Sequence, residues 1–256
     1  MMKITREFLR TATALIAFLC SGCMGNGHKP METLTYAEPA GNKQLIVFLR
    51  GLGGTWRCFW EPHKCFETEG LVEAVRERKL PFDMVAPNAH FGYYKDRTID
   101  DRLMQDVIRP AKAKGYEKIW LAGVSMGGLG SILFLRNHPK YIDGVLLLGP
   151  YLGDASIADE ISKAGGLMQW SPGLYDGQKD WQRLIWDWLK QYCAKPDGRT
   201  PIYLGVGNDD QYYDVQKLLA DSLPANRVIA VEGGHSPATF KKIWQIFLDK
   251  HVLSAS

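Results

Sequence analysis

A serine flanked by glycines is the residue of this chain best suited to covalent chemistry. The segment Gly123-Val124-Ser125-Met126-Gly127 fits the pattern G-x-S-x-G, with an apolar run, 118–120, before it and a helical pattern, 129–138, after it. A serine on such a sharp strand-to-helix turn projects its hydroxyl from the end of a sheet, and the glycines allow the turn because they lack a Cβ. The backbone N–H of Met126, at the helix start, would then face a developing oxyanion. The segment therefore predicts Ser125 as a nucleophile.

The serine needs partners, because its hydroxyl is a weak nucleophile and a chain with 26 glycines can contain this pattern by chance. A base must take its proton, and an acid must orient that base. His235 follows two glycines after one apolar run, and Asp209 and Asp210 follow Gly207 after another. We expect His235 as the base and favour Asp210 as the acid, because it stands three residues after the glycine. Asp209 remains the alternative, and the other aspartate would cap the next helix.

The glycine-rich loop 50–54 would supply a second oxyanion donor. It follows an early strand, and its glycines let the backbone approach a substrate closely. We assign the Leu52 N–H to this role, paired with the Met126 N–H. The loop is not a dinucleotide fingerprint, because Trp56 stands where the third glycine should be.

The remaining histidines and the cysteines carry weaker signals. His90 follows a strand and would line the pocket, but it precedes the serine in the chain. His63 lies between Cys58 and Cys65, and these three residues have no fourth metal ligand nearby. In an oxidising compartment the two cysteines would pair instead. We therefore predict no metal and no organic cofactor.

Apolar runs alternate with helical patterns along the chain, which predicts a mostly parallel sheet covered by helices on both faces. Pro110 would kink or end its helix. The predicted strands are 44–50, 82–86, 118–123, 144–149, 202–206 and 227–231, and the predicted helices are 70–79, 99–115, 126–138, 212–221 and 237–251.

Residues 151–200 interrupt this alternation. They contain four of the eight tryptophans, and apolar residues recur at helical spacing between Trp181 and Tyr192. We favour a helical cap over the carboxyl ends of the strands, where open α/β sheets bind ligands. The alternative is a helix that packs on the core.

The amino terminus is typical of an export signal. Basic residues precede an apolar stretch, 11–20, that is too short to span a bilayer, and Ser21-Gly22-Cys23 resembles a lipoprotein processing site. We predict a signal peptide at 1–22, lipidation of Cys23 and a tether at 23–42, with plain secretion after cleavage nearby, or a retained anchor, as the alternatives. The protein would then be a membrane-anchored lipoprotein facing the periplasm or the cell exterior. Without residues 1–22 the net charge falls from +3 to +1, so the charge gives no indication of nucleic-acid binding.

Together, the Ser125 turn, the Asp210 turn and the Gly-Gly-His235 turn, in this order, resemble the α/β-hydrolase superfamily over about residues 43–252. Arg50 departs from that pattern, because relatives often carry histidine there. The resemblance implies a doubly wound, mostly parallel sheet of about eight strands, with only the second antiparallel, in a domain spanning 43–256. It is similar in particular to small bacterial hydrolases of unassigned substrate.

The activity implied by this resemblance is hydrolysis of a carboxylic ester through an acyl-enzyme. The partners would be a small-molecule or lipid ester and, through Cys23, a membrane surface. An acyltransferase or thioesterase would use the same triad, and a non-catalytic binding lipoprotein could share the scaffold. The sequence leaves the substrate and the oligomeric state open.

Overall fold

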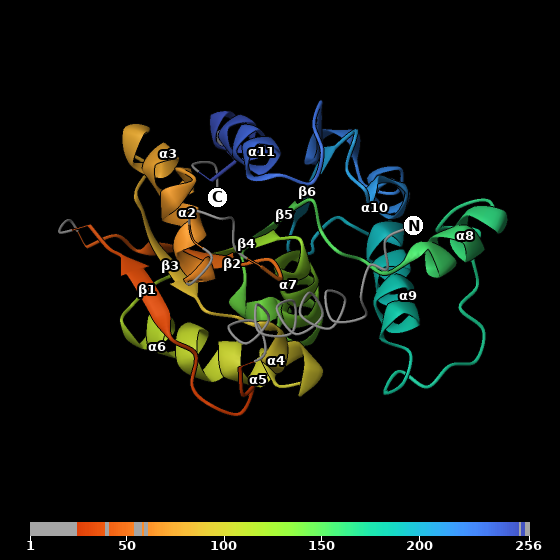
Figure 1. The fold of residues 1–256 in the computed structure, drawn as a ribbon, viewed down its shortest axis with the longest axis horizontal. Coiled ribbons are helices and arrows are strands. Elements are labelled where there is room, and N and C mark those ends of the chain that lie inside the picture. Colours follow the sequence, from red (N-terminus) through yellow and green to blue (C-terminus); the bar gives the residue numbers. More distant parts are fainter. Residues whose placement is uncertain (1–24, 39–40, 54–57, 59–60, 251, 254–256) are drawn as a thin grey trace, which may run out of the picture.

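A seven-stranded sheet forms the centre of the computed structural model, which describes residues 25–38, 41–53, 58, 61–250 and 252–253 (Figure 1). The strand order is β1-β3-β2-β4-β5-β6-β7, and every neighbouring pair is parallel except β1 and β3. The strands are β1 (Thr33–Tyr36), β2 (Gln44–Leu49), β3 (Phe82–Pro87), β4 (Lys118–Val124), β5 (Gly144–Leu148), β6 (Ile202–Gly207) and β7 (Val228–Val231). The predicted mostly parallel sheet is confirmed, with seven described strands in place of about eight, and the antiparallel strand is the first described one, where the second was expected.

The central strands are apolar throughout because both faces of the sheet are covered. In β2, Leu45, Val47 and Leu49 enter one core cluster, while Ile46 and Phe48 enter the other. Successive side chains of a strand point to opposite faces, so a strand buried on both faces has no polar positions to alternate with.

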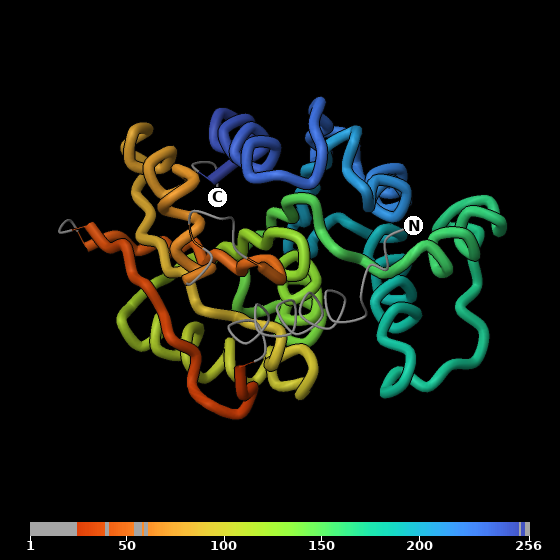
Figure 2. The backbone as a smooth tube through the Cα atoms, in the orientation of Figure 1, coloured from red at the N-terminus to blue at the C-terminus, as the bar shows by residue number. Residues whose placement is uncertain are grey.

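Helices form a layer on each face (Figure 1). One layer holds α2 (Cys65–Thr68), α3 (Leu71–Glu77) and α11 (Pro237–Asp249), and α11 contacts α3 although the two lie far apart in the sequence (Figure 2). The opposite layer contains α4 (Phe91–Lys95), α5 (Ile99–Leu103), α6 (Arg109–Ala113), α7 (Met126–Asn137), α8 (Ala155–Lys163), α9 (Trp181–Ala194) and α10 (Tyr213–Ala220). Short helical turns lie at Pro62–Lys64, Pro139–Tyr141 and Ala225–Arg227.

The helix predicted over 99–115 continues past Pro110. Between α5 and α6 the chain widens into a π-helical turn, Met104–Ile108. Proline has no N–H to donate and its ring collides with the carbonyl four residues earlier, so a wider turn ahead of Pro110 accommodates it.

The predicted tether, 23–42, is wrong in part, because its second half is built into the domain. β1 pairs antiparallel with β3, and the Met31 N–H donates to Asp106 Oδ2 at 2.8 Å. Even Gly25 is closely packed, since a Cβ there would overlap the His90 ring. The signal peptide at 1–22 and Cys23 lie outside the described residues. In the part of the chain that is described, no helix is both long and apolar enough to cross a bilayer.

The insertion 151–200 lies beside α7 and α10 (Figure 1). In α9, Ile185, Trp186 and Leu189 are fully buried in the core, and Trp186 Nε1 donates to the Leu152 carbonyl at 2.8 Å. The apolar face predicted from the helical spacing therefore covers the side of the domain.

Candidate active site

Ser125 occupies a strained turn between β4 and α7. Its φ of 52° and ψ of −114° lie where residues other than glycine rarely occur, and such strain costs about 1–3 kcal/mol. A Cβ on Gly123 would collide with the Gly127 carbonyl, and one on Gly127 would collide with the Leu49 carbonyl. The glycines therefore let the chain turn tightly enough to present Ser125 at the carboxyl edge of the sheet, as the pattern predicts.

Asp210 and His235 form a hydrogen-bonded pair at the same edge. His235 Nδ1 lies 2.7 Å from Asp210 Oδ2, and the aspartate side chain is fully buried whereas the imidazole is 20% exposed. The Tyr212 N–H donates to Asp210 Oδ1 at 2.8 Å. Asp209 is exposed, and the aspartate that pairs with His235 is Asp210.

The turns that carry these two residues are joined backbone to backbone. The Asn208 N–H donates to the Val231 carbonyl at 2.9 Å, and the Asp209 N–H donates to the Gly233 carbonyl at 3.1 Å. A Cβ on Gly207 would collide with the Gly233 carbonyl. Gly207, three residues before Asp210, thus allows the ends of β6 and β7 to meet.

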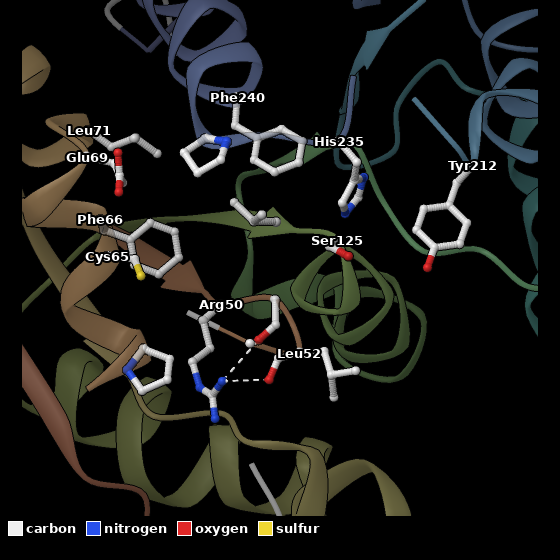
Figure 3. A pocket seen from close by; sticks show the side chains of 15 residues that line it. Arg50, Leu52, Cys65, Phe66, Glu69, Leu71, Ser125, Tyr212, His235 and Phe240 are labelled. Atoms are coloured by element: carbon white, nitrogen blue, oxygen red, sulfur yellow. Dashed lines mark hydrogen bonds between the residues drawn. The ribbon is translucent and has the colours of Figure 1, made fainter. Parts of the chain in front are cut away.

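The imidazole of His235 is held between two aromatic rings. Tyr212 and Phe240 each meet it edge to face at 5.1 Å between ring centroids. Figure 3 shows His235 beside Ser125 at the wall of one pocket. No hydrogen bond joins these two side chains among the described residues, and such contacts often tighten only when substrate binds.

Hydrogen bonds to the buried Asp210 carboxylate favour its ionised form. Burial acts to raise the pKa of Asp210, but the hydrogen bond from His235 and the N–H of Tyr212 outweigh it, so the pKa lies below its usual value. An ionised carboxylate accepts the proton on Nδ1 and leaves Nε2 of the imidazole as the basic nitrogen.

Arg50 fixes the loop that contains Leu52. Its buried guanidinium donates from Nη1 to the Gly51 and Leu52 carbonyls, both at 3.1 Å (Figure 3). Its Nε donates to Asn88 Oδ1 at 2.9 Å. The Gly51 carbonyl and the Leu52 N–H belong to one planar peptide and point in opposite directions. Arg50 therefore sets the direction of the Leu52 N–H. Met126 is the first residue of α7, where a backbone N–H has no partner within the helix.

The pocket has a volume of about 350 Å³ and contains the predicted residues Ser125, His235 and Leu52. Its other lining residues are mostly apolar: Arg50, Gly51, Gly53, Pro62, Cys65, Phe66, Glu69, Leu71, Val124, Tyr212, Pro237 and Phe240. None of the lining residues described comes from 151–200, so the prediction of a cap over the site is wrong for the insertion. The wall facing Ser125 comes instead from α2 and the residues beside it (Figure 3).

Cys58 and Cys65 form a disulfide, with 5.5 Å between their Cα atoms. The bond removes both thiolates that a metal site with His63 would need. Burial lowers the pKa of His63, which favours a neutral ring. His90 is absent from the pocket lining and stacks on Tyr93 at 4.1 Å between centroids.

Solved structures share this fold, although no family model and no curated protein matches the sequence. Est1E from Butyrivibrio proteoclasticus, also solved with ferulic acid bound, is 15% identical over 87% of this chain and 94% of its own, with a TM-score of 0.55. MGS-MChE2, an α/β-hydrolase enzyme from the metagenome of lagoon sediments of Mar Chica, Morocco, is 17% identical over 90% and 98%, with a TM-score of 0.51. The protein has the α/β-hydrolase fold.

A third neighbour with this fold is the monoacylglycerol lipase of Paleococcus ferrophilus, which is 16% identical over 87% of this chain and 100% of its own, with a TM-score of 0.50. Within the α/β-hydrolase fold, Ser125, Asp210 and His235 follow β4, β6 and β7. Sequence reasoning missed Gln216, whose amide reaches Asp210, and the role of Arg50. Gln216 belongs to no sequence pattern that distinguishes it from other helical glutamines. Arg50 stands out beside the glycine loop, but the sequence does not indicate which groups it contacts.

Proposed function

We propose that the protein is a serine hydrolase that cleaves a carboxylic ester or a related acyl bond. The observation that carries the proposal is the hydrogen-bonded pair of Asp210 and His235 beside Ser125, which shares one pocket with His235. The mostly apolar lining suits an acyl or alkyl group. The monoacylglycerol lipase and the ferulic acid complex of Est1E support an acyl substrate.

The reaction would proceed in two steps through an acyl-enzyme. In the first step, Ser125 Oγ bonds to the carbonyl carbon while His235 Nε2 takes the hydroxyl proton. The tetrahedral intermediate then collapses, and the imidazolium returns that proton to the leaving alcohol. In the second step, water gives a proton to His235 and bonds to the acyl carbon. The bond from that carbon to Ser125 Oγ then breaks, the imidazolium returns the proton to Oγ, and the carboxylic acid is released.

The N–H groups of Leu52 and Met126 are proposed to stabilise the oxyanion. Donors held rigidly where charge develops contribute more than flexible ones, because they need no reorganisation during the reaction. Two structural features provide that rigidity. Arg50 fixes the peptide of Leu52, and the start of α7 fixes that of Met126.

We further propose that the protein is exported and anchored by a lipid on Cys23. The basic and apolar segments before Cys23 motivate this proposal. The Cys58–Cys65 disulfide supports it, because disulfides persist in oxidising compartments and are rare in the cytosol. Replacement of Cys23 by serine should move the protein from the membrane fraction to the soluble fraction.

The nucleophile is tested by Ser125→Ala in the purified full-length chain. We expect the variant to lose hydrolysis of short p-nitrophenyl esters by at least about 10³-fold and to lose labelling by a fluorophosphonate probe. Ser162→Ala, at an exposed position on α8, is the matched control and should retain both.

Each alternative predicts a different result. Probe labelling that survives Ser125→Ala would remove the serine from its role. Transfer of the acyl group to an added alcohol, in place of free acid, would indicate an acyltransferase. A folded wild-type protein that neither labels nor hydrolyses any ester or thioester would point to a binding lipoprotein.

A further inference from the structure

A fully buried glutamine lies behind the candidate active site. Gln216 of α10 places its Nε2 at 3.2 Å from Asp210 Oδ2 and 3.3 Å from the Pro150 carbonyl. Carboxylate and carbonyl oxygens only accept hydrogen bonds, so the amide nitrogen must be the atom that faces them. Each of its two protons therefore has an acceptor.

The same amide connects the acid to the nucleophile turn. Pro150 follows β5, and the next residue, Tyr151, donates its N–H to the Ser125 carbonyl at 2.9 Å. Pro150 also packs against the start of α7, where a Cβ on Gly128 would meet its ring. A continuous path of hydrogen bonds and covalent bonds thus runs from His235 through Asp210 and Gln216 to Ser125.

Fold stability alone does not account for an amide at this position. Among the described residues Gln216 Oε1 has no hydrogen-bond partner, although the side chain is fully buried. A buried acceptor without a donor is costly, and an apolar side chain of the same shape would avoid that cost. Within the described part of the chain, the hydrogen bonds of the amide go only to Asp210 and Pro150, so its role would act through the positions of these two residues.

We propose that Gln216 is a positioning residue that holds the Asp210 carboxylate in the orientation required by His235. The inference rests on the proposed Ser-His-Asp mechanism. Three donors fix the carboxylate plane, with Tyr212 N–H on Oδ1 and both His235 and Gln216 on Oδ2. Without Gln216, the Tyr212 N–H is the only donor among the described residues, besides the imidazole, that holds the carboxylate, so the carboxylate can rotate. Oδ2 also loses one hydrogen bond, so its negative charge acts more strongly on His235.

The charged and titratable surroundings of this cluster are few. Among the described residues, Asp210 and His235 face each other, and the Tyr212 ring meets the imidazole from the start of α10. Phe240 of α11 covers the other side of the imidazole. If substitution of Gln216 changes the pH dependence of activity, the change would therefore arise from Asp210 and His235 themselves.

The first test is Gln216→Met, which keeps the shape and removes the donor. We expect kcat for p-nitrophenyl esters to fall about 10- to 100-fold with KM within about twofold, because a hydrogen bond to a charged group is lost. The acid limb of the kcat/KM profile should move to higher pH, since a carboxylate with one donor fewer stabilises the imidazolium more strongly. Gln191→Met is the matched control, because that exposed amide on α9 also donates to an aspartate, Asp187, at 3.2 Å.

Gln216→Glu separates positioning from a merely structural role. Its carboxyl donates a hydrogen bond to Asp210 only while protonated, and it repels Asp210 when ionised. We expect the ratio of variant to wild-type kcat to rise as the pH falls from about 8 to about 5. A merely structural defect would leave that ratio independent of pH.

The outcomes distinguish this proposal from the proposed function. A Gln216→Met enzyme with wild-type kcat and pH profile, while Ser125→Ala is inactive, overturns the role of Gln216 alone. A Gln216→Met chain that fails to fold makes the amide structural and overturns it too. If the wild type has no esterase activity, the proton NMR signal of the His235 Nδ1–H in the folded protein still decides. That proton is hydrogen-bonded to Asp210, so its signal should shift in the Gln216→Met variant, and an unchanged signal refutes the proposal.

Discussion

Arg50 carries the clearest consequence at the scale of single residues. It is only 2% exposed, and its Nη1 donates to the Gly51 carbonyl, which belongs to the same peptide as the Leu52 N–H, and to the Leu52 carbonyl. We expect Arg50→Met to lower kcat by about 10²- to 10³-fold with little change in KM, because the oxyanion donor proposed at Leu52 would act mainly in the transition state.

Arg50→Lys should recover only part of that loss, since an ammonium cannot reproduce the guanidinium fork. Steady-state kinetics on both variants provide the measurement, with near-UV circular dichroism to verify folding. Wild-type kcat in a folded Arg50→Met enzyme would show that the loop is positioned without the arginine.

Asp210→Asn should lower kcat by about 10⁴-fold, because the asparagine amide favours the wrong tautomer of the imidazole. It should also change how stability depends on pH. The pKa of Asp210 is below its ordinary 3.8 in the fold, so the ionised form stabilises the folded state above that value, and this contribution disappears as the pH falls through the folded pKa.

The gap in the free energy of unfolding between wild type and Asp210→Asn should therefore be largest near neutral pH and close below about pH 4. Urea unfolding at several pH values measures it. Asp209→Asn, at an exposed position, should show no such gap at any pH.

The positions of Ser125, Asp210 and His235 at the carboxyl ends of strands could be predicted, because glycines mark the turns that carry them. The order of strands within a parallel sheet did not need to be known, since all carboxyl ends meet at one edge. Gln216 could not be predicted in this way, because its contact to Asp210 depends on the rotation of α10 against β6, which leaves no mark on a single side chain.

At the scale of elements, the disulfide and α2 build the pocket wall together. Cys65, Phe66 and Glu69 all line the pocket, and Cys58–Cys65 closes a short loop beside them. Replacing both cysteines by serine should lower the free energy of unfolding by about 2–3 kcal/mol through the added freedom of the unfolded chain.

The same double variant should raise KM for long esters more than for short ones, because longer acyl chains reach the loosened wall. A series of ester lengths measures this effect. Leu174→Ser, at a fully exposed site in the insertion, should leave KM unchanged at every length. A larger effect from Leu174→Ser than from the cysteine pair would restore the insertion as a cap.

Sequence patterns predicted six of the seven described strands but missed β1. β1 is a four-residue edge strand in which only Tyr36 is buried, so its polar-looking sequence resembles a linker. For α9, the spacing of apolar residues predicted the apolar face. Which surface this face covers depends on tertiary packing, which the spacing does not indicate. An amphipathic helix has the same pattern over a pocket and beside α7.

At the scale of the whole molecule, the chain's first described residues lie at the same edge as the candidate site. Gly25 packs on His90, which follows β3, and β3 runs parallel to the strand that ends at Ser125. Only Met24 separates Gly25 from Cys23, and two residues span about 7 Å at most. The proposed lipid would therefore hold this edge close to the bilayer.

Inserting about ten Gly and Ser residues after Met24 tests this geometry, because such a linker is flexible. We expect hydrolysis of esters embedded in vesicles to fall severalfold, while hydrolysis of water-soluble esters stays unchanged. Equal rates for both enzymes on vesicles would show that the short connection has no effect on access to substrate.

Because Gly25 packs closely on His90, a lipid on Cys23 would keep the candidate site at the membrane surface. This would change the kinetics of the enzyme. Such an enzyme would work in two dimensions, where the rate depends on the mole fraction of ester in the membrane and hardly at all on its molarity in the surrounding water. Adding inert lipid would then inhibit the reaction by surface dilution, even though the total amount of substrate is constant.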